Sequence, residues 1–131
     1  MLFRSFELPV DVLIPAALPN SINKDNVNKI KAKIIVEAAN IPMTPDIEER
    51  LFKKNILVVP DFVANAGGVI SSYAEYVGRN PDHMMEMVKE KVVRNTHLVL
   101  EKSKSKDIKP RDAAMDIAVE RVREDMRKRN L

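Results

Sequence analysis

The chain has 131 residues, a length typical of one domain, and 45% of them are apolar, enough for a hydrophobic core. Charged residues make up 31%, so we expect a folded chain with a well-solvated surface rather than a disordered one. The absence of cysteine excludes disulfides, thiolate metal sites and a cysteine nucleophile, and it is compatible with the reducing cytoplasm in which we expect the protein to work.

The net charge of +3 arises in residues 101–131, which hold ten basic and seven acidic side chains. Acids and bases alternate there, as they do on a solvated helix face, so we do not expect nucleic-acid binding. The two histidines, His83 and His97, lie too far apart in sequence to suggest a metal site. No apolar run approaches the roughly 20 residues that a membrane span needs, so no membrane association is predicted.

Three short apolar runs predict three strands, at residues 10–14, 34–36 and 56–59. Pro15 closes the first run and Pro60 closes the third. Each run is rich in β-branched residues and nearly continuous, which is typical of parallel strands that are buried on both faces.

Helical signals lie between these runs. Residues 23–30 place Val27 and Ile30 three apart, and a better-marked helix begins at Thr44, with Pro45 at its first position. Ile47, Leu51 and Phe52 are expected to face the sheet. The order strand–helix–strand–helix–strand predicts parallel pairing with right-handed crossovers.

After the third strand, three helical segments are predicted: residues 65–77, ending at Gly78; a helix from Asn80 to a polar linker at 102–106; and a last helix from Pro110. We interpret their apolar stripes as core or interface packing. The stripes consist of Met85, Val88, Val92 and Val99, and of Met115, Ala118, Val122 and Met126. The predicted fold class is therefore α/β: a parallel βαβαβα unit at residues 8–78, followed by C-terminal helices at 80–131.

Ligands of open parallel sheets bind at the carboxyl ends of the strands. The loops there consist of small residues: Ala16 and Ala17 after the first strand, Asn40 after the second, and Asn65 before a Gly-Gly pair after the third. Small residues let a flat ligand approach the backbone, and an asparagine amide suits a carboxamide or ribose hydroxyls. Tight turns and helix caps explain the same residues, and the pattern alone leaves both interpretations open.

The chain has only three glycines, which cannot form the G-x-G-x-x-G turn that holds a dinucleotide pyrophosphate. The sequence nevertheless resembles the glutamate dehydrogenases of the Glu/Leu/Phe/Val dehydrogenase family, from about residue 8 to the end. The resemblance is carried by the segments 9–18 (PVDVLIPAAL), 35–40 (IVEAAN), 58–69 (VVPDFVANAGGV), 72–76 (SYAEY), 111–114 (RDAA) and 118–122 (AVERV).

The resemblance implies that residues 1–131 form one partial dinucleotide-binding domain, with a half-Rossmann unit at 8–78 and C-terminal helices at 80–131. It also implies a set of cofactor contacts. Asn40 looks like the asparagine that contacts the nicotinamide-side ribose. Asn65 resembles the one beside the nicotinamide carboxamide and the α-carbon of the substrate. Ala16 and Ala17 would line the cofactor cleft through their backbone. The implied cofactor is NAD or NADP. The sequence does not distinguish the two, because the residues that do so belong to the glycine-rich unit.

The resemblance also implies a substrate contact and an activity. Ser72 matches the serine that helps bind the side-chain carboxylate of the substrate, and Val69 lies one turn before it. The complete enzyme converts L-glutamate to 2-oxoglutarate and ammonia. The substrate domain with its catalytic lysine and aspartate has no counterpart here, so we expect this chain to be a C-terminal fragment that is inactive alone and binds the cofactor weakly or not at all.

An alternative function is a non-catalytic half-Rossmann module that binds protein or nucleic acid. In a doubly wound sheet the run at 10–14 would lie beside a strand of the other half. We therefore expect an exposed apolar edge there, which favours a homo-oligomer through this strand or shielding of it by residues 1–8.

Overall fold

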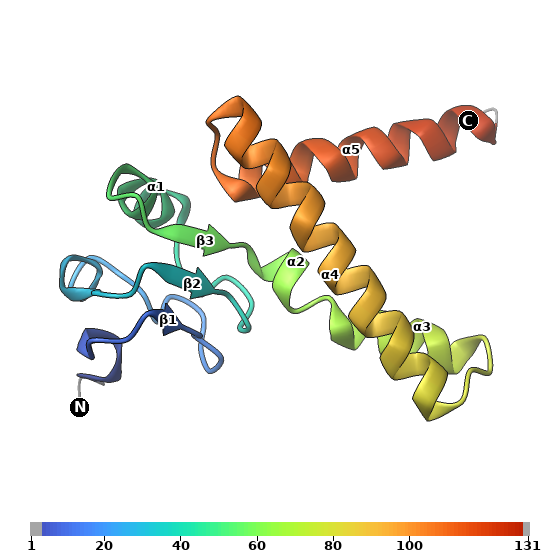
Figure 1. Ribbon diagram of the computed structural model, residues 1–131, viewed down its shortest axis with the longest axis horizontal. Coiled ribbons are helices and arrows are strands. Elements are labelled where there is room, and N and C mark those ends of the chain that lie inside the picture. The colour runs from blue at the N-terminus through green and yellow to red at the C-terminus, as the bar shows by residue number, and fades with distance from the viewer. Residues whose placement is uncertain (1–3, 130–131) are drawn as a thin grey trace.

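The computed structural model describes residues 4–129, which form a three-stranded parallel sheet followed by long helices (Figure 1). The strands are β1 (Val12–Leu13), β2 (Ile34–Val36) and β3 (Leu57–Val59), and they lie in the order β1-β2-β3. Ile35 is paired with Leu13 on one side and with Val58 on the other. The predicted α/β class is confirmed, although β1 and β3 are shorter than the runs at 10–14 and 56–59.

Both faces of the sheet are covered, as continuous apolar strands require. Successive side chains of a strand point to opposite faces. Ile35 and Val58 belong to one core cluster, which also contains Val27 and Leu51. Val59 belongs to a second cluster with Val63, Val99, Ala113 and Ala114, and Val36 packs against that cluster. The sheet therefore separates two apolar layers, and the C-terminal helices form the second one.

Helix α1 (Pro45–Lys53) connects β2 to β3, as predicted, and buries Ile47 and Leu51. The helix predicted at 23–30 is wrong: only the 3-10 turn η2 (Val27–Lys29) forms there. The side chain of Asn23 accepts a hydrogen bond from the N–H of Asp25 over 3.0 Å, a local turn that competes with a helix. A second 3-10 turn, η1 (Arg4–Glu7), precedes β1.

The segment after β3 consists of two helices rather than the single one predicted at 65–77. α2 (Asp61–Ala64) is one turn long, and α3 (Gly67–Tyr76) follows after a break at Asn65 and Ala66. Gly78, with φ of +72°, lies just beyond the end of α3, in a conformation that favours glycine. The break keeps Asn65 in a loop at the edge of the sheet.

Helix α4 (Pro81–Lys106) begins where Asn80 predicts, and the Asn80 side chain accepts from the N–H of His83 over 2.9 Å. The polar linker predicted at 102–106 is wrong, because these residues form the last turn of α4. Lysines suit the negative end of a helix, and the hydroxyl of Ser103 donates to the carbonyl of Ile108 over 2.6 Å. Helix α5 (Pro110–Lys128) begins at the predicted Pro110.

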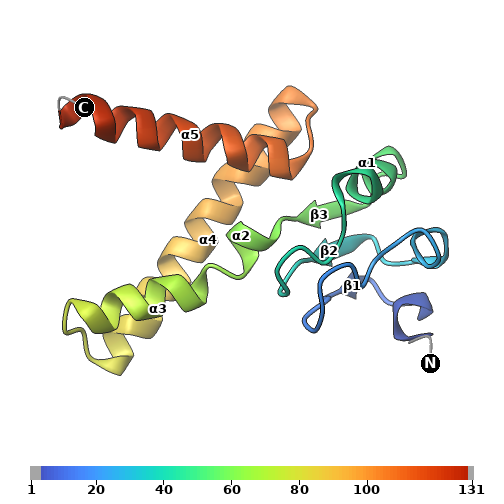
Figure 2. The same ribbon diagram turned by 180° about the vertical axis from the view of Figure 1, so that it is seen from behind.

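Helix α4 lies between α3 and α5, and the hairpin of α3 with the first half of α4 extends away from the sheet (Figures 1 and 2). Consequently only part of the predicted stripes is core. Val99 is buried, but Met85 on α4 and Met115, Val122 and Met126 on α5 are exposed. None of the described helices has an apolar stretch long enough to cross a membrane.

Strand β1 forms one outer edge of the sheet, and its apolar side chains are open to solvent. Val12 is 46% exposed and Ile14 58% exposed. Within the described part of the segment 1–8, Phe6 packs against the first core cluster and Leu8 is itself exposed. The expected exposed edge is therefore present; residues 1–3 lie outside the described residues.

Candidate functional site

The loops after β1 and β2 are joined at the carboxyl edge of the sheet. The N–H groups of Ala38 and Ala39 donate to the carbonyl oxygen of Pro15 over 3.1 and 2.8 Å. Ala16 and Ala17 follow Pro15 directly, and both are exposed. The structure therefore places the two alanines beside the loop that carries Asn40, with no large side chain of their own above the backbone.

Asn40 and Asn65 come together at this edge, although 25 residues separate them in sequence. Nδ2 of Asn65 donates to Oδ1 of Asn40 over 2.7 Å, and it lies 3.4 Å from the carbonyl oxygen of Ala38. Asn40 is exposed and Asn65 is half-buried. The pair offers the Nδ2 donor of Asn40 and the Oδ1 acceptor of Asn65, which is a set that matches a carboxamide or ribose hydroxyls.

The backbone after Asn40 is strained, and hydrogen bonds to Asp61 hold it in place. Ile41 has a φ of +49°, which a β-branched residue rarely adopts. Its N–H donates to Oδ2 of Asp61 over 2.9 Å, and Oδ1 of Asp61 accepts from the N–H of Phe62. The carbonyl of Asp61 accepts from the N–H of Asn65 over 2.7 Å. Asp61 thus fixes the turn that carries Asn40 and the turn that carries Asn65.

Arg111, at the start of α5, lies at the centre of a buried ionic cluster under these loops. Its three guanidinium nitrogens donate to three carboxylates: to Glu37 over 2.7 Å, to Glu48 over 2.7 Å and to Asp61 over 3.0 Å. Glu37 also accepts from the N–H of Asp61 over 2.8 Å. The planar guanidinium suits this role because it presents several donors in a fixed fork. Its centre lies 5.5 Å from the ring centroid of Phe62.

Two carboxylates of the cluster, those of Glu37 and Asp61, have pKa values shifted in opposite directions. Burial raises the pKa of Glu37 to about 7, although the charge of Arg111 and the hydrogen bond from Asp61 act in the opposite direction. Burial also disfavours the ionised form of Asp61. There, however, hydrogen bonds from Ile41 and Phe62 and the pairing with Arg111 prevail, so the pKa of Asp61 lies below its ordinary value. The pKa of Glu37 therefore lies in the neutral range, whereas that of Asp61 does not.

Val69 and Ser72 lie on α3 and are both exposed. The hydroxyl of Ser72 donates to the carbonyl oxygen of Gly68 over 3.1 Å, one turn earlier in the same helix. Gly67 allows α3 to approach α4, because a Cβ there would lie 3.3 Å from Cγ1 of Val88. Gly67 thus has a packing role in addition to any role towards a ligand, whereas a Cβ at Gly68 would meet no atom within 4 Å.

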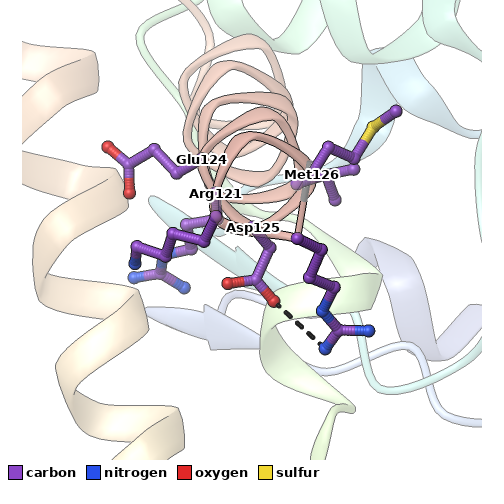
Figure 3. A pocket seen from close by; sticks show the side chains of 7 residues that line it. Arg121, Glu124, Asp125 and Met126 are labelled. Atoms are coloured by element: carbon purple, nitrogen blue, oxygen red, sulfur yellow. Dashed lines mark ion pairs between the residues drawn. The ribbon is translucent and has the colours of Figure 1, made fainter. Parts of the chain in front are cut away.

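Figure 3 shows a different feature, an open hollow of about 560 Å³ at the C-terminal end of α5. The residues that line it lie on α5, apart from Arg129 directly after the helix, and an ion pair of 3.7 Å joins Asp125 to Arg129 within it. Because the end of a single helix forms its wall, it is a surface groove rather than an enclosed site, and it lies far along α5 from the sheet (Figure 1). The described residues contain no group of three or more side chains suited to hold a metal ion.

The ionic cluster is the part of the site that sequence reasoning missed. Arg111 lies 74 residues from Glu37 and 50 from Asp61, and no local pattern joins them. A signal was nevertheless present: Glu37 follows a fully apolar strand, where a charge needs a buried partner.

Comparisons with known proteins agree with the fold and with the resemblance. A model of the family described as Glutamate/Leucine/Phenylalanine/Valine dehydrogenase matches residues 3–130. The chain is 46% identical over 127 residues to a glutamate dehydrogenase of Aeropyrum pernix, covering 88% of this chain and 30% of that protein. It is 42% identical over 130 residues to an NAD-specific glutamate dehydrogenase of Staphylococcus aureus, covering 95% and 31%.

Two solved structures are similar in fold. A hetero-hexameric glutamate dehydrogenase from Thermus thermophilus aligns with a TM-score of 0.86 at 29% identity, covering 100% of this chain and 33% of that one. An L-tryptophan dehydrogenase from Nostoc punctiforme aligns with a TM-score of 0.84 at 31% identity, covering 93% and 37%.

The parallel sheet and these similarities place the fold in the class of Rossmann-like dehydrogenases. Within that class, the chain belongs to the Glutamate/Leucine/Phenylalanine/Valine dehydrogenase family. It spans 30% and 31% of the length of the two curated relatives.

Proposed function

We propose that this chain provides the nicotinamide-binding part of an NAD(P)-dependent glutamate dehydrogenase, which deaminates L-glutamate oxidatively to 2-oxoglutarate and ammonia. The observation that carries the proposal is the 2.7 Å contact between the side chains of Asn40 and Asn65 at the carboxyl ends of β2 and β3. Ligands of open α/β sheets bind at this edge. The names of the two curated relatives favour glutamate as the substrate.

The family resemblance assigns each cofactor contact, and the position of each residue at the edge of the sheet supports the assignment. Asn40, the more exposed of the pair, binds the nicotinamide-side ribose, and Asn65 binds the carboxamide of the nicotinamide ring. The backbone at Ala16 and Ala17 lines the cleft, where small side chains allow close approach. NAD(P) supplies the hydride acceptor when it is bound. The residues of this chain orient the ring and leave proton transfer to groups elsewhere.

The substrate contacts lie on α3. Ser72 binds the side-chain carboxylate of glutamate, for which its hydroxyl must turn away from the carbonyl of Gly68. Val69, 77% exposed and one turn earlier, lines the same pocket with an apolar surface. An exposed valine beside a serine that can turn outwards is consistent with a pocket that closes only against further protein.

A titration with NAD⁺, followed by the NMR signals of the side-chain amides, tests the cofactor site. We expect weak binding, at millimolar concentrations, with the largest shifts at Asn40 and Asn65 and none at Asn95, a matched asparagine on α4. Asn65→Ala should abolish the shift at Asn40, whereas Asn95→Ala should leave it unchanged. Shifts confined to α4 and α5, with both site asparagines unmoved at saturation, would contradict the proposal.

We further propose that the isolated chain does not oxidise glutamate, because the family's catalytic lysine and aspartate have no counterpart in its 131 residues. Acid–base groups of this kind contribute about 10²–10⁴-fold to a rate. Formation of NADH from glutamate and NAD⁺, in proportion to the amount of the chain, would refute this part.

The exposed edge at residues 10–14 is the proposed contact between copies of the chain. Val10, Val12 and Ile14 present apolar side chains there. The outer side of β1 also presents backbone groups that another strand can pair with.

A further inference from the structure

The contacts beneath the two asparagines form one connected path. Arg111 binds Glu37 and Asp61, and Asp61 in turn holds the N–H of Ile41, next to Asn40, and through its own carbonyl the N–H of Asn65. Each link is 2.7–3.0 Å long. Helix α5 is thereby connected to both loops of the site without touching either asparagine.

The two carboxylates at the base of this path are almost fully enclosed. Glu37 has no exposed surface, and Glu48 on α1 is 2% exposed. In each of them one oxygen binds Arg111, and the other, Oε1, is buried with no hydrogen-bond partner among the described residues. A buried acceptor without a donor is costly, and a proton on Glu37 would turn that acceptor into a donor.

We propose that Arg111 is a positioning residue, which sets the geometry of Asn40 and Asn65 through Glu37 and Asp61, and that the charge on Glu37 is transmitted along the same contacts to the asparagine pair. The charged groups that face Glu37 are Arg111 from α5, Glu48 from α1 and Asp61 from the start of α2. When Glu37 is ionised, its Oε2 accepts strong hydrogen bonds from Arg111 and from the N–H of Asp61.

When Glu37 takes up a proton, both of these hydrogen bonds weaken, and Arg111 is drawn towards the two remaining carboxylates. Asp61 then shifts together with the N–H of Ile41 that it holds. The pKa of about 7 places this change near neutral pH. The inference rests on the proposed function only in naming Asn40 and Asn65 as the site, because the contacts themselves involve no ligand.

The test uses the ¹⁵N-labelled chain without cofactor. From about pH 5 to about pH 9, on both sides of the pKa of about 7, the side-chain amide of Asn65 and the N–H groups of Ile41 and Asp61 should titrate with the midpoint of the Glu37 carboxyl. Glu37→Gln should remove these transitions. If Glu37 titrates while the loops do not respond, or if the loops titrate unchanged in Glu37→Gln, the proposal is wrong.

A conservative variant gives a second arm. Arg111→Lys keeps the charge but cannot reach three carboxylates at once, so the separate signal of the bonded Asn65 amide should be lost. Arg121→Lys, on the same helix and bonded to half-buried Asn95, is the matched control and should leave that signal in place. A folded Arg111→Lys chain with unchanged Asn65 signals would overturn the proposal. If this variant does not fold, the pH titration of the unchanged chain decides. A failure of NAD⁺ to bind would affect only the proposed function.

Discussion

Arg111, Glu37, Glu48 and Asp61 form a cluster of charged side chains that is costly to bury. Burying an ion in a protein costs several kcal/mol, and one guanidinium compensates three carboxylates only in part. For Glu37 this penalty is visible, since it is fully buried and its pKa rises to about 7. Such a cluster contributes little to the stability of the fold. We therefore interpret its role as holding the loops that carry Asn40 and Asn65 in place.

This cluster makes stability depend on pH. The pKa of Glu37 is about 7 in the folded chain and near its ordinary 4.5 when unfolded. The folded state therefore keeps a proton that the unfolded state loses, and the free energy of unfolding falls as pH rises from 4.5 to about 7. The predicted loss is up to about 3 kcal/mol, and it ends above the folded pKa. Urea unfolding at several pH values measures it.

The matched variants are Glu37→Gln, which should remove this slope, and Glu75→Gln, an exposed carboxyl on α3, which should retain it. The low pKa of Asp61 acts in the opposite direction, but only below the ordinary value of 3.8, so it does not mask the effect. An equal slope in Glu37→Gln would assign the pH dependence to another group.

At the scale of single residues, the sequence predicts the positions of residues that directly follow strands. Asn40 and Asn65 meet because parallel strands end at one edge, and their positions follow from topology alone. Arg111 could not be placed in this way. Its partners are distant in sequence, and an arginine near a helix start has the same local pattern whether it is solvated or buried. The strain at Ile41 was equally hidden, because no glycine marks this left-handed turn in the sequence.

At the scale of elements, helix ends follow local chemistry. Asn80 and Thr44 each precede a helix that has proline at the first position. The side chain of Asn80 caps its helix, whereas the hydroxyl of Thr44 donates to the carboxylate of Asp46 and caps no backbone N–H. Where the predictions failed, polar side chains decided the outcome: Asn23 closed a turn within residues 23–30, and the lysines of 102–106 continued α4.

The difference between these caps predicts unequal effects on stability. Asn80→Ala removes the acceptor for the His83 N–H and should lower the free energy of unfolding by about 1 kcal/mol. Thr44→Ala is the control and should cost only a few tenths of a kcal/mol, since it removes an exposed contact that caps nothing. Chemical denaturation of both variants checks this, and equal losses would show that the Asn80 hydrogen bond contributes nothing.

At the scale of the whole molecule, the apolar side chains that lie in solvent include those of the β1 edge and the stripe of Met115, Val122 and Met126 on α5. The sequence correctly predicts the exposed edge, because the strand order leaves β1 without an outer neighbour. It does not tell which apolar helix stripe is covered. A helix pattern shows that one face is apolar but not which other surface lies against it, and α5 extends well beyond the sheet (Figure 2).

If β1 mediates self-association, a lysine on the edge strand should prevent it. Val12→Lys is therefore expected to shift the chain towards monomer in sedimentation velocity. Val122→Lys, a comparable change on α5, should leave the association unchanged. If Val122→Lys alone dissociates the chain, the contact between copies lies on α5 and not on β1. If the unchanged chain is already monomeric, neither surface mediates self-association.

The central claim is that these residues form the nicotinamide-binding part of a glutamate dehydrogenase, and a chimera tests it most directly. In the Aeropyrum pernix relative, this chain would replace the matching segment, which is 46% identical over 127 residues. The account predicts a folded chimera that forms NADH from glutamate. Asn65→Ala should lower the rate of this chimera about 10-fold or more, because it removes one contact that orients the cofactor. A folded chimera with no activity on glutamate, or one indifferent to Asn65→Ala, would contradict it.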